Sequence, residues 1–329
     1  MANVADRSET STIDRTVWTT TPTCRICRAA WNMAPGMIAA GKDGKAIFVR
    51  QPETPDEMMQ VWRAALACPT GSILAPRGLP VPDHVFPEEL APNLYRLGYN
   101  DNATAGAHPF FIRTSTGLNV LVDGPRYVEK LVEFFEQQGG LDHVLLTHRD
   151  DVGASAKYAK RFGARLWIHE NDREASPEAT DILTGYDVTE PIPGVTVIPI
   201  PGHTIGSVAF LADERLFVGD SLNWLIDEKR LWTNPLRCWD DWDMQRRSLK
   251  RLQDFRFDYL LAGHGGSIGL PAERMQAELA TCLDALDETT WQPLTHFPNG
   301  VPIPDEMKQF WQTEVPRAKA DFFAAMSRT

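Results

Sequence analysis

Side chains that could bind a metal ion follow apolar runs at four separate places in this 329-residue sequence, in the motifs LLTHRDD, PGHT, VGD and AGHG. Imidazole nitrogens and carboxylate oxygens are ligands of zinc, and catalytic zinc sites use three or more of them. The pattern therefore predicts one metal site whose ligands are His148, Asp150, His203, Asp220 and His264.

The apolar runs before these motifs are short and bounded by turn residues, which indicates β-strands. Helical spacing lies between them, so strands and helices interleave and the fold class is expected to be α/β. A strand end holds a ligand rigidly, and neighbouring glycines let loops approach a common centre. Helices are expected near residues 126–138, 155–162, 239–255, 270–288 and 305–325.

The order of the motifs resembles the metallo-β-lactamase superfamily, in which THxHxDH is followed by PGHT, GD and GH. The resemblance covers roughly residues 90 to 290. It implies an αββα sandwich and a hydrolase that uses a zinc-activated water. Asp123 in LVDGP is similar to the strand-end aspartate of the family, which supports the ligand loop without binding the metal.

This chain departs from the family pattern at its first motif, which reads HRDDVG. Without a gap, Asp150 replaces the second histidine, and the closing Asp-His pair falls on a valine and a glycine. With two residues deleted, Asp150 and Asp151 fall on that closing pair, and both alignments stay open. Without a gap, the second metal position keeps only Asp220 and His264, so one catalytic zinc ion is expected.

The resemblance also implies catalytic roles for residues of the same motifs. Asp150 and Asp151 belong to the catalytic set, with Asp151 able to accept a proton. His264 is expected either to bind the metal or to donate a hydrogen bond to the substrate. Polar and aromatic residues follow Asp220 closely and could wall an apolar pocket or belong to the core. The substrate-pocket candidates are Asn223, Trp224 and Trp242.

A second motif lies near the N-terminus: Cys24-x-x-Cys27, with ACPTG around Cys68 further on. It resembles a single-cluster bacterial ferredoxin module, which uses four cysteine thiolates, the third placed three residues after the second. That position is Ala30 in this chain. A [3Fe-4S] cluster, a cluster with a foreign ligand and a decayed scaffold remain open. The missing cysteine favours the decayed scaffold, so an iron-sulfur cluster is not expected.

Composition shifts divide the chain, with the Pro-rich stretch APRGLPVP after residue 74 as the clearest boundary. We expect a flexible arm over residues 1–20, a degenerate ferredoxin-like module over 21–80, a catalytic domain over 81–295 and a helical tail over 296–329.

The formal net charge of −11 argues against nucleic acid as a partner, because phosphate binding requires clustered lysine and arginine. An N-terminal signal peptide and long apolar segments are not evident, so no membrane partner and a cytoplasmic location are expected. A small-molecule substrate is the expected partner. The Trp- and Phe-rich tail, together with the resemblance, favours a homodimer.

The ferredoxin-like head, the altered HRDD motif and the chain length together resemble the chlorothalonil hydrolytic dehalogenases of the same superfamily. The resemblance implies replacement of an aromatic chloride, on a ring activated by nitriles, by hydroxyl. Hydrolysis of a lactone, thioester or β-lactam is the alternative within enzymes. A redox protein with an iron cluster and a non-catalytic binding protein are alternatives from other classes.

Overall fold

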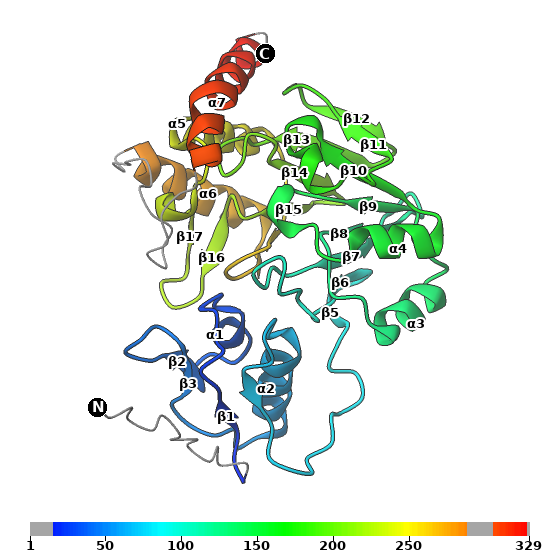
Figure 1. Cartoon of the computed structure of the whole chain (residues 1–329), viewed down its shortest axis with the longest axis vertical. Coiled ribbons are helices and arrows are strands. Elements are labelled where there is room, and N and C mark those ends of the chain that lie inside the picture. The colour runs from blue at the N-terminus through cyan, green and yellow to red at the C-terminus, as the bar shows by residue number, and fades with distance from the viewer. Residues whose placement is uncertain (1–15, 288–304, 328–329) are drawn as a thin grey trace, which may run out of the picture.

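Two β-sheets stack face to face at the centre of the molecule, with helices on their outer sides (Figure 1). The structure is a computed structural model that describes residues 16–287 and 305–327. The seven-stranded sheet contains, in spatial order, β11 (Asp181–Leu183), β10 (Arg165–His169), β9 (His143–Leu145), β8 (Asn119–Val122), β7 (Phe110–Arg113), β6 (Leu94–Arg96) and β5 (Glu88–Ala91). The six-stranded sheet contains β12 (Thr189–Ile192), β13 (Val195–Pro199), β14 (Val208–Ala212), β15 (Arg215–Gly219), β18 (Tyr259–Ala262) and β19 (Ile268–Gly269).

The strands are apolar on both faces, because each sheet is covered on both sides. In β8, Val120 and Val122 pack in the core between the sheets, whereas Leu121 between them packs outward against helices. Phe110 of one sheet meets Phe217 of the other, with ring centroids 5.9 Å apart. The period of two along each strand therefore builds two apolar layers instead of one.

Two pairs of helices complete the sandwich. Helices α3 (Glu129–Gln137) and α4 (Ser155–Phe162) cover the seven-stranded sheet, and α4 ends at Gly163, whose φ of 68° suits a glycine. Helices α5 (Trp242–Ser248) and α6 (Ala272–Asp287) cover the six-stranded sheet (Figure 1). This arrangement confirms the expected α/β class and the αββα layers.

The N-terminal module is a separate small unit beside the sandwich (Figure 1). Its longest element, α2, begins with a capping box formed by Thr54 and Glu57. Trp18 is 3% exposed and packs edge-on against Trp62, so the folded chain begins before residue 21, where the sequence predicted a loose arm. The elements are β1 (Thr19–Thr20), α1 (Ala29–Met33), β2 (Ile38–Ala40), β3 (Ala46–Phe48), α2 (Pro55–Ala67) and β4 (Ile73–Leu74).

A long C-terminal helix, α7 (Asp305–Met326), matches the predicted tail helix, while residues 296–304 of that tail lie outside the described residues. Its buried Phe322 packs against Tyr186, Ile205 and Met244 of the sandwich. Within residues 16–287 and 305–327, the helices lack the combination of length and apolar composition needed to span a bilayer.

Candidate metal centre

The four metal-type motifs meet at one edge of the sandwich because the strands before them run in the same direction. Strands β8 and β9 are parallel neighbours, and so are β15 and β18. Strand β13 runs parallel to β15, because β14 lies antiparallel between them. The backbone N–H of Val208 donates to the carbonyl of Thr147 at 2.9 Å and joins the two sheets beside the site.

Ligand atoms of His148, Asp150 and His203 all lie within 4.8 Å of one another, and Asp220 approaches this group at His203. Asp150 Oδ2 lies 3.8 Å from His148 Nε2 and 3.5 Å from His203 Nε2. Asp220 Oδ2 lies 3.8 Å from His203 Nε2. A tetrahedral zinc ion with ordinary bond lengths separates its ligands by about 3.3–3.4 Å. The observed distances therefore fit one ion after small movements of the side chains.

His148 is held in the tautomer that a metal requires. Thr147 Oγ1 donates its hydrogen to the carboxylate of Asp123 at 3.0 Å and therefore accepts one from His148 Nδ1, also at 3.0 Å. His148 Nε2 is left with a lone pair. This atom is buried and has no hydrogen-bond partner among the described residues, as expected for an atom that binds a metal.

His203 is held in the same tautomer as His148, but by a backbone carbonyl instead of a hydroxyl group. Its Nδ1 lies 2.7 Å from the carbonyl of Arg237, which can only accept, so Nδ1 carries the hydrogen. The Nε2 atom faces Asp150 and Asp220, and it too is buried without a partner in the described part of the chain. Two fixed imidazoles with unpaired Nε2 atoms indicate that these residues fit a metal.

Asp123 lies at the end of β8 and contacts Thr147, the residue before His148. It accepts hydrogen bonds from both the backbone and the hydroxyl of Thr147, at distances of 2.9–3.0 Å. Its φ of 59° is costly for an aspartate and is sustained by these bonds. Burial raises the pKa of Asp123 to about 7. Asp123 therefore orients His148 through Thr147.

Asp151 points inward and is completely buried, unlike Asp150, whose side chain is 43% exposed. Its Oδ2 lies 3.9 Å from His148 Nδ1, and neither oxygen has a hydrogen-bond partner among the described residues. Burial, and then the negative charge of Asp220, raise its pKa well above the usual range. With His148 and Asp220 it forms a second group whose ligand atoms lie within 4.8 Å of one another.

The charges of the site favour a cation. Burial, and then His203, lower the pKa of His148 to about 4, so this imidazole is neutral near pH 7. The two imidazoles hold the pKa of Asp150 down to about 2, against the effect of its partial burial. The pKa of His203 is raised, because Asp150 and Asp220 outweigh the effect of its burial. These two carboxylates face the imidazoles across a space that a divalent ion would suit.

His264 differs from its expected role as a metal ligand. Its Nδ1 lies 2.8 and 2.9 Å from the two oxygens of Asp220, and it also hydrogen-bonds the backbone of Ala105. Both groups of described residues that could hold an ion lack it. His264 therefore orients Asp220 in this structure. The same loop, residues 101–108, is tied to the site again by the backbone N–H of His108, which donates to the carbonyl of Gly263 at 2.7 Å.

Arg149 stabilises the turn that carries the ligands, η1 (Arg149–Asp151), without facing the ligand atoms. Its guanidinium donates twice to Asp240, at 2.8 and 2.9 Å, and lies 3.6 Å from Asp172. Asp172 accepts from the backbone of Arg149 and from Thr204, the residue after His203. Burial raises the pKa of Asp172 to about 6. One ion-pair network therefore joins two ligand loops.

The pocket candidates fall in different places. Trp242 is 4% exposed and packs in the core under the six-stranded sheet, which corrects its assignment to the pocket. Asn223 and Trp224 begin β16 (Asn223–Leu225), which pairs with β17 (Arg230–Trp232), and both are half-buried. Trp239 lies nearer the ligands, with its ring centroid 6.1 Å from that of His203. Sequence spacing could not distinguish these tryptophans.

Comparison with known proteins covers both parts of the chain. Residues 21–74 match the family described as "4Fe-4S single cluster domain of Ferredoxin I". The hydroxyacylglutathione hydrolase of Acidiphilium cryptum is 35% identical over 111 residues, which are 32% of this chain and 45% of that protein. That of Shewanella pealeana is 31% identical, over 33% of this chain and 43% of its own length. The chain thus spans less than half of either hydrolase.

Two further comparisons concern the sandwich. The protein YobT of Bacillus subtilis is 29% identical over 41% of this chain and 72% of its own length. The DIM-1 metallo-β-lactamase superposes with a TM-score of 0.46 and 18% identity, over 59% of this chain and 96% of its own. The two facing sheets, their outer helices and the ligands at the strand ends decide the fold. This is a metallo-β-lactamase fold. In this domain, Gly219 takes a φ of 51°, and a side chain there would meet Thr147 Oγ1 at 2.5 Å.

Proposed function

We propose that this protein is a metal-dependent hydrolase with one zinc ion held by His148, Asp150, His203 and Asp220. The observation that carries the proposal is the convergence of two buried, unpaired Nε2 atoms on two carboxylates, at separations of 3.5–3.8 Å. The similarity to hydroxyacylglutathione hydrolases supports hydrolysis. The ion would supply a nucleophilic water at neutral pH.

The residues around the ion divide the remaining work. Asp150 is the most exposed of the four proposed ligands. It therefore faces the side from which a substrate would arrive. Asp151, buried and unpaired among the described residues, is the proposed proton acceptor. His264 keeps Asp220 oriented. Trp239, beside His203, would form an apolar wall for the substrate.

The substrate class we propose is a chlorinated aromatic nitrile such as chlorothalonil. In this reaction the carbon–chlorine bond breaks, a carbon–oxygen bond forms with oxygen from water, and chloride and a proton are released. The support is the resemblance to chlorothalonil hydrolytic dehalogenases, which rests on the HRDD turn with Asp150 beside the two histidines and on the ferredoxin-like head. A flat aromatic ring could stack near Trp239.

Thioester hydrolysis is the second candidate, favoured by the similarity to the two hydroxyacylglutathione hydrolases. The same site would then act on a carbonyl carbon and release a thiol. The two candidates differ in the product: chloride from an aryl chloride, or thiol from a glutathione thioester. Parallel assays on the same zinc-loaded protein distinguish them.

The test of the metal site is elemental analysis of freshly purified protein, followed by both assays. We expect about one zinc ion per chain in the wild type. The variant His203→Ala should lose both the zinc and the activity, whereas His84→Ala, at an exposed histidine outside the site, should keep both. Full zinc retention by His203→Ala would show that the ligand set is wrong. Bound zinc with neither chloride nor thiol release would refute both substrate classes.

A further inference from the structure

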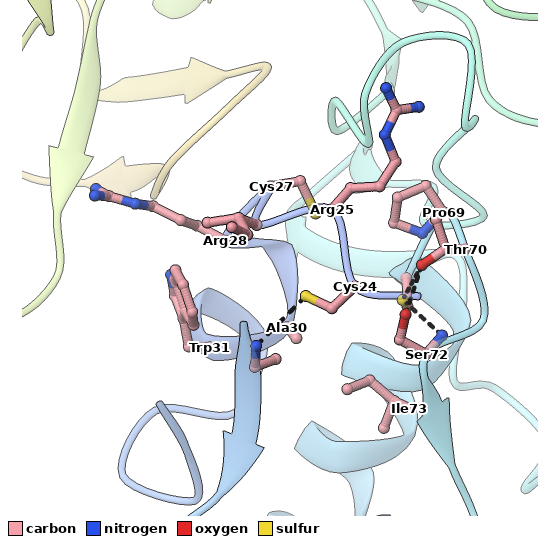
Figure 2. Close-up of a pocket in the computed structure, with 13 residues that line it drawn as sticks. Cys24, Arg25, Cys27, Arg28, Ala30, Trp31, Pro69, Thr70, Ser72 and Ile73 are labelled. Carbon is pink, nitrogen blue, oxygen red and sulfur yellow. Dashed lines mark hydrogen bonds between the residues drawn. The ribbon is translucent and has the colours of Figure 1, made fainter. Parts of the chain in front are cut away.

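Three cysteines surround one enclosed cavity in the N-terminal module (Figure 2). Cys24 and Cys27 lie in the loop before α1, and Cys68 caps the C-terminus of α2. The thiols of Cys24 and Cys68 are near enough to Cys27 to interact with it electrostatically. The sequence places Cys68 more than forty residues from the others, and folding of the module brings all three to the same cavity.

Two of the three sulfur atoms accept a hydrogen bond from a backbone N–H group. Ala46 donates to Cys24 Sγ at 3.4 Å, and Ser72 donates to Cys68 Sγ at 3.1 Å. Burial raises the pKa of the Cys27 thiol to about 11, although the nearby backbone of Ala29 opposes this shift. Hydrogen bonds to sulfur stabilise thiolates and tune the potential of iron-sulfur clusters.

The donors in this cavity do not fit a cluster with four cysteine ligands. Ala30, at the position of the missing third cysteine, lines the cavity and is 8% exposed. The other lining residues in the described part of the chain offer no imidazole and no carboxylate. They are Arg25, Ile26, Arg28, Trp31, Ala46, Pro69, Thr70, Ser72 and Ile73. A fourth iron would lack a protein ligand of the usual kinds.

We propose that Cys24, Cys27 and Cys68 bind a [3Fe-4S] cluster. In such a cluster each iron takes one thiolate and shares the sulfides, so three cysteines complete the coordination and Ala30 leaves the open corner. Three thiolates with this core carry net negative charge, and two arginines, Arg25 and Arg28, belong to the loop that lines the cavity, with their guanidinium groups directed outward (Figure 2). The proposal replaces the expectation of a cysteine remnant and does not depend on the proposed hydrolase activity.

The experiment uses the full chain, purified without oxygen, reconstituted with ferrous iron and sulfide, and desalted. The His203→Ala background removes iron bound at the metal centre. We expect about three irons and four acid-labile sulfides per chain, and an electron paramagnetic resonance signal in the oxidised state that reduction abolishes. Cys68→Ser should lose sulfide and signal. Cys282→Ala, at a buried cysteine of α6, should keep both.

A gain of iron gives the sharper test. Ala30→Cys supplies the missing thiolate, so it should bind a fourth iron, and its signal should appear in the reduced state instead of the oxidised state. Because this variant should gain iron, a positive result cannot be explained by a failure to fold. The proposal is overturned if the wild type retains no sulfide, if one zinc ion without sulfide occupies the cysteines, or if Cys68→Ser keeps the cluster.

Discussion

Arg149 neutralises two carboxylates that have no exposure to solvent, those of Asp172 and Asp240. Asp240 Oδ2 also accepts from the backbone of Ile205 at 2.8 Å, so the same carboxylate fixes the loop after His203. Through these contacts Arg149 holds the two ligand loops together.

Removing this guanidinium should destabilise the fold. Arg149→Leu leaves buried charges without a partner, which costs about 3–5 kcal/mol of the free energy of unfolding. The matched control is Arg161→Leu, because Arg161 is 47% exposed and pairs with an equally exposed Glu136, a pair worth about 0–1 kcal/mol. Urea unfolding followed by circular dichroism measures both. Equal losses of unfolding free energy in the two variants would contradict a stabilising role for Arg149 between the ligand loops.

Gly263 allows two carboxylates to approach the same point. A methyl group at this position would lie 2.7 Å from Asp151 Oδ2 and 2.9 Å from Asp220 Oδ1. Gly263→Ala should therefore displace these carboxylates and weaken zinc binding by about 10–100-fold. Gly41→Ala, in the N-terminal module, should leave zinc affinity unchanged. Competition with a zinc chelator gives the affinity, and an unchanged value in Gly263→Ala would show that the site has more space than the geometry allows.

At the scale of elements, α7 braces the loops that build the metal centre. Trp311 donates its indole N–H to Asp240 at 3.2 Å, and Phe310 lies under the guanidinium of Arg149 at 5.5 Å. Lys319 pairs with Asp241, the residue that caps α5. The C-terminal helix thus contacts the same ion-pair network that joins the ligand loops.

Two neighbouring phenylalanines of α7, Phe322 and Phe323, differ in burial and therefore give a matched pair of variants. Phe322 is completely buried, so Phe322→Ala should cost about 3–5 kcal/mol of stability. The next residue, Phe323, is only half-buried beside Arg247, so Phe323→Ala should cost much less. Thermal unfolding of both variants tests the difference. If the two losses are alike, α7 does not anchor through Phe322.

The elements were largely predictable from the sequence, and the details of the site were not. Short apolar runs bounded by turn residues and the stop at Gly163 are local signals, so the strands before the four motifs and α4 fall where expected. The inward turn of Asp151 and the pairing of His264 with Asp220 depend on loops from two sheets, which no local pattern records. Trp242 lies in the core because of the way α5 packs on the sheet.

At the scale of the whole molecule, side chains of the sandwich reach into the N-terminal module. Arg126 donates to the carbonyl of Leu66 at 3.0 Å, and Arg25 of the module donates to the carbonyl of Asn102 at 2.8 Å. The expected homodimer remains a proposal. Sedimentation that shows only a 36.9 kDa species would refute it.

The loop of residues 101–108 contacts both centres. Ala105 hydrogen-bonds His264 at the metal centre, and the next residue, Gly106, lies against Cys27: a methyl group there would approach its sulfur to 3.1 Å. If the proposed cluster and the proposed zinc ion each change the position of this backbone segment, their binding is thermodynamically linked, and linkage is reciprocal. Cluster loading should therefore shift zinc affinity by at least about fivefold, and zinc should shift cluster retention by the same factor. Zinc titration of the wild type, Cys68→Ser and Cys282→Ala measures the coupling free energy, and identical affinities would mean that the protein carries two independent cofactors on one chain.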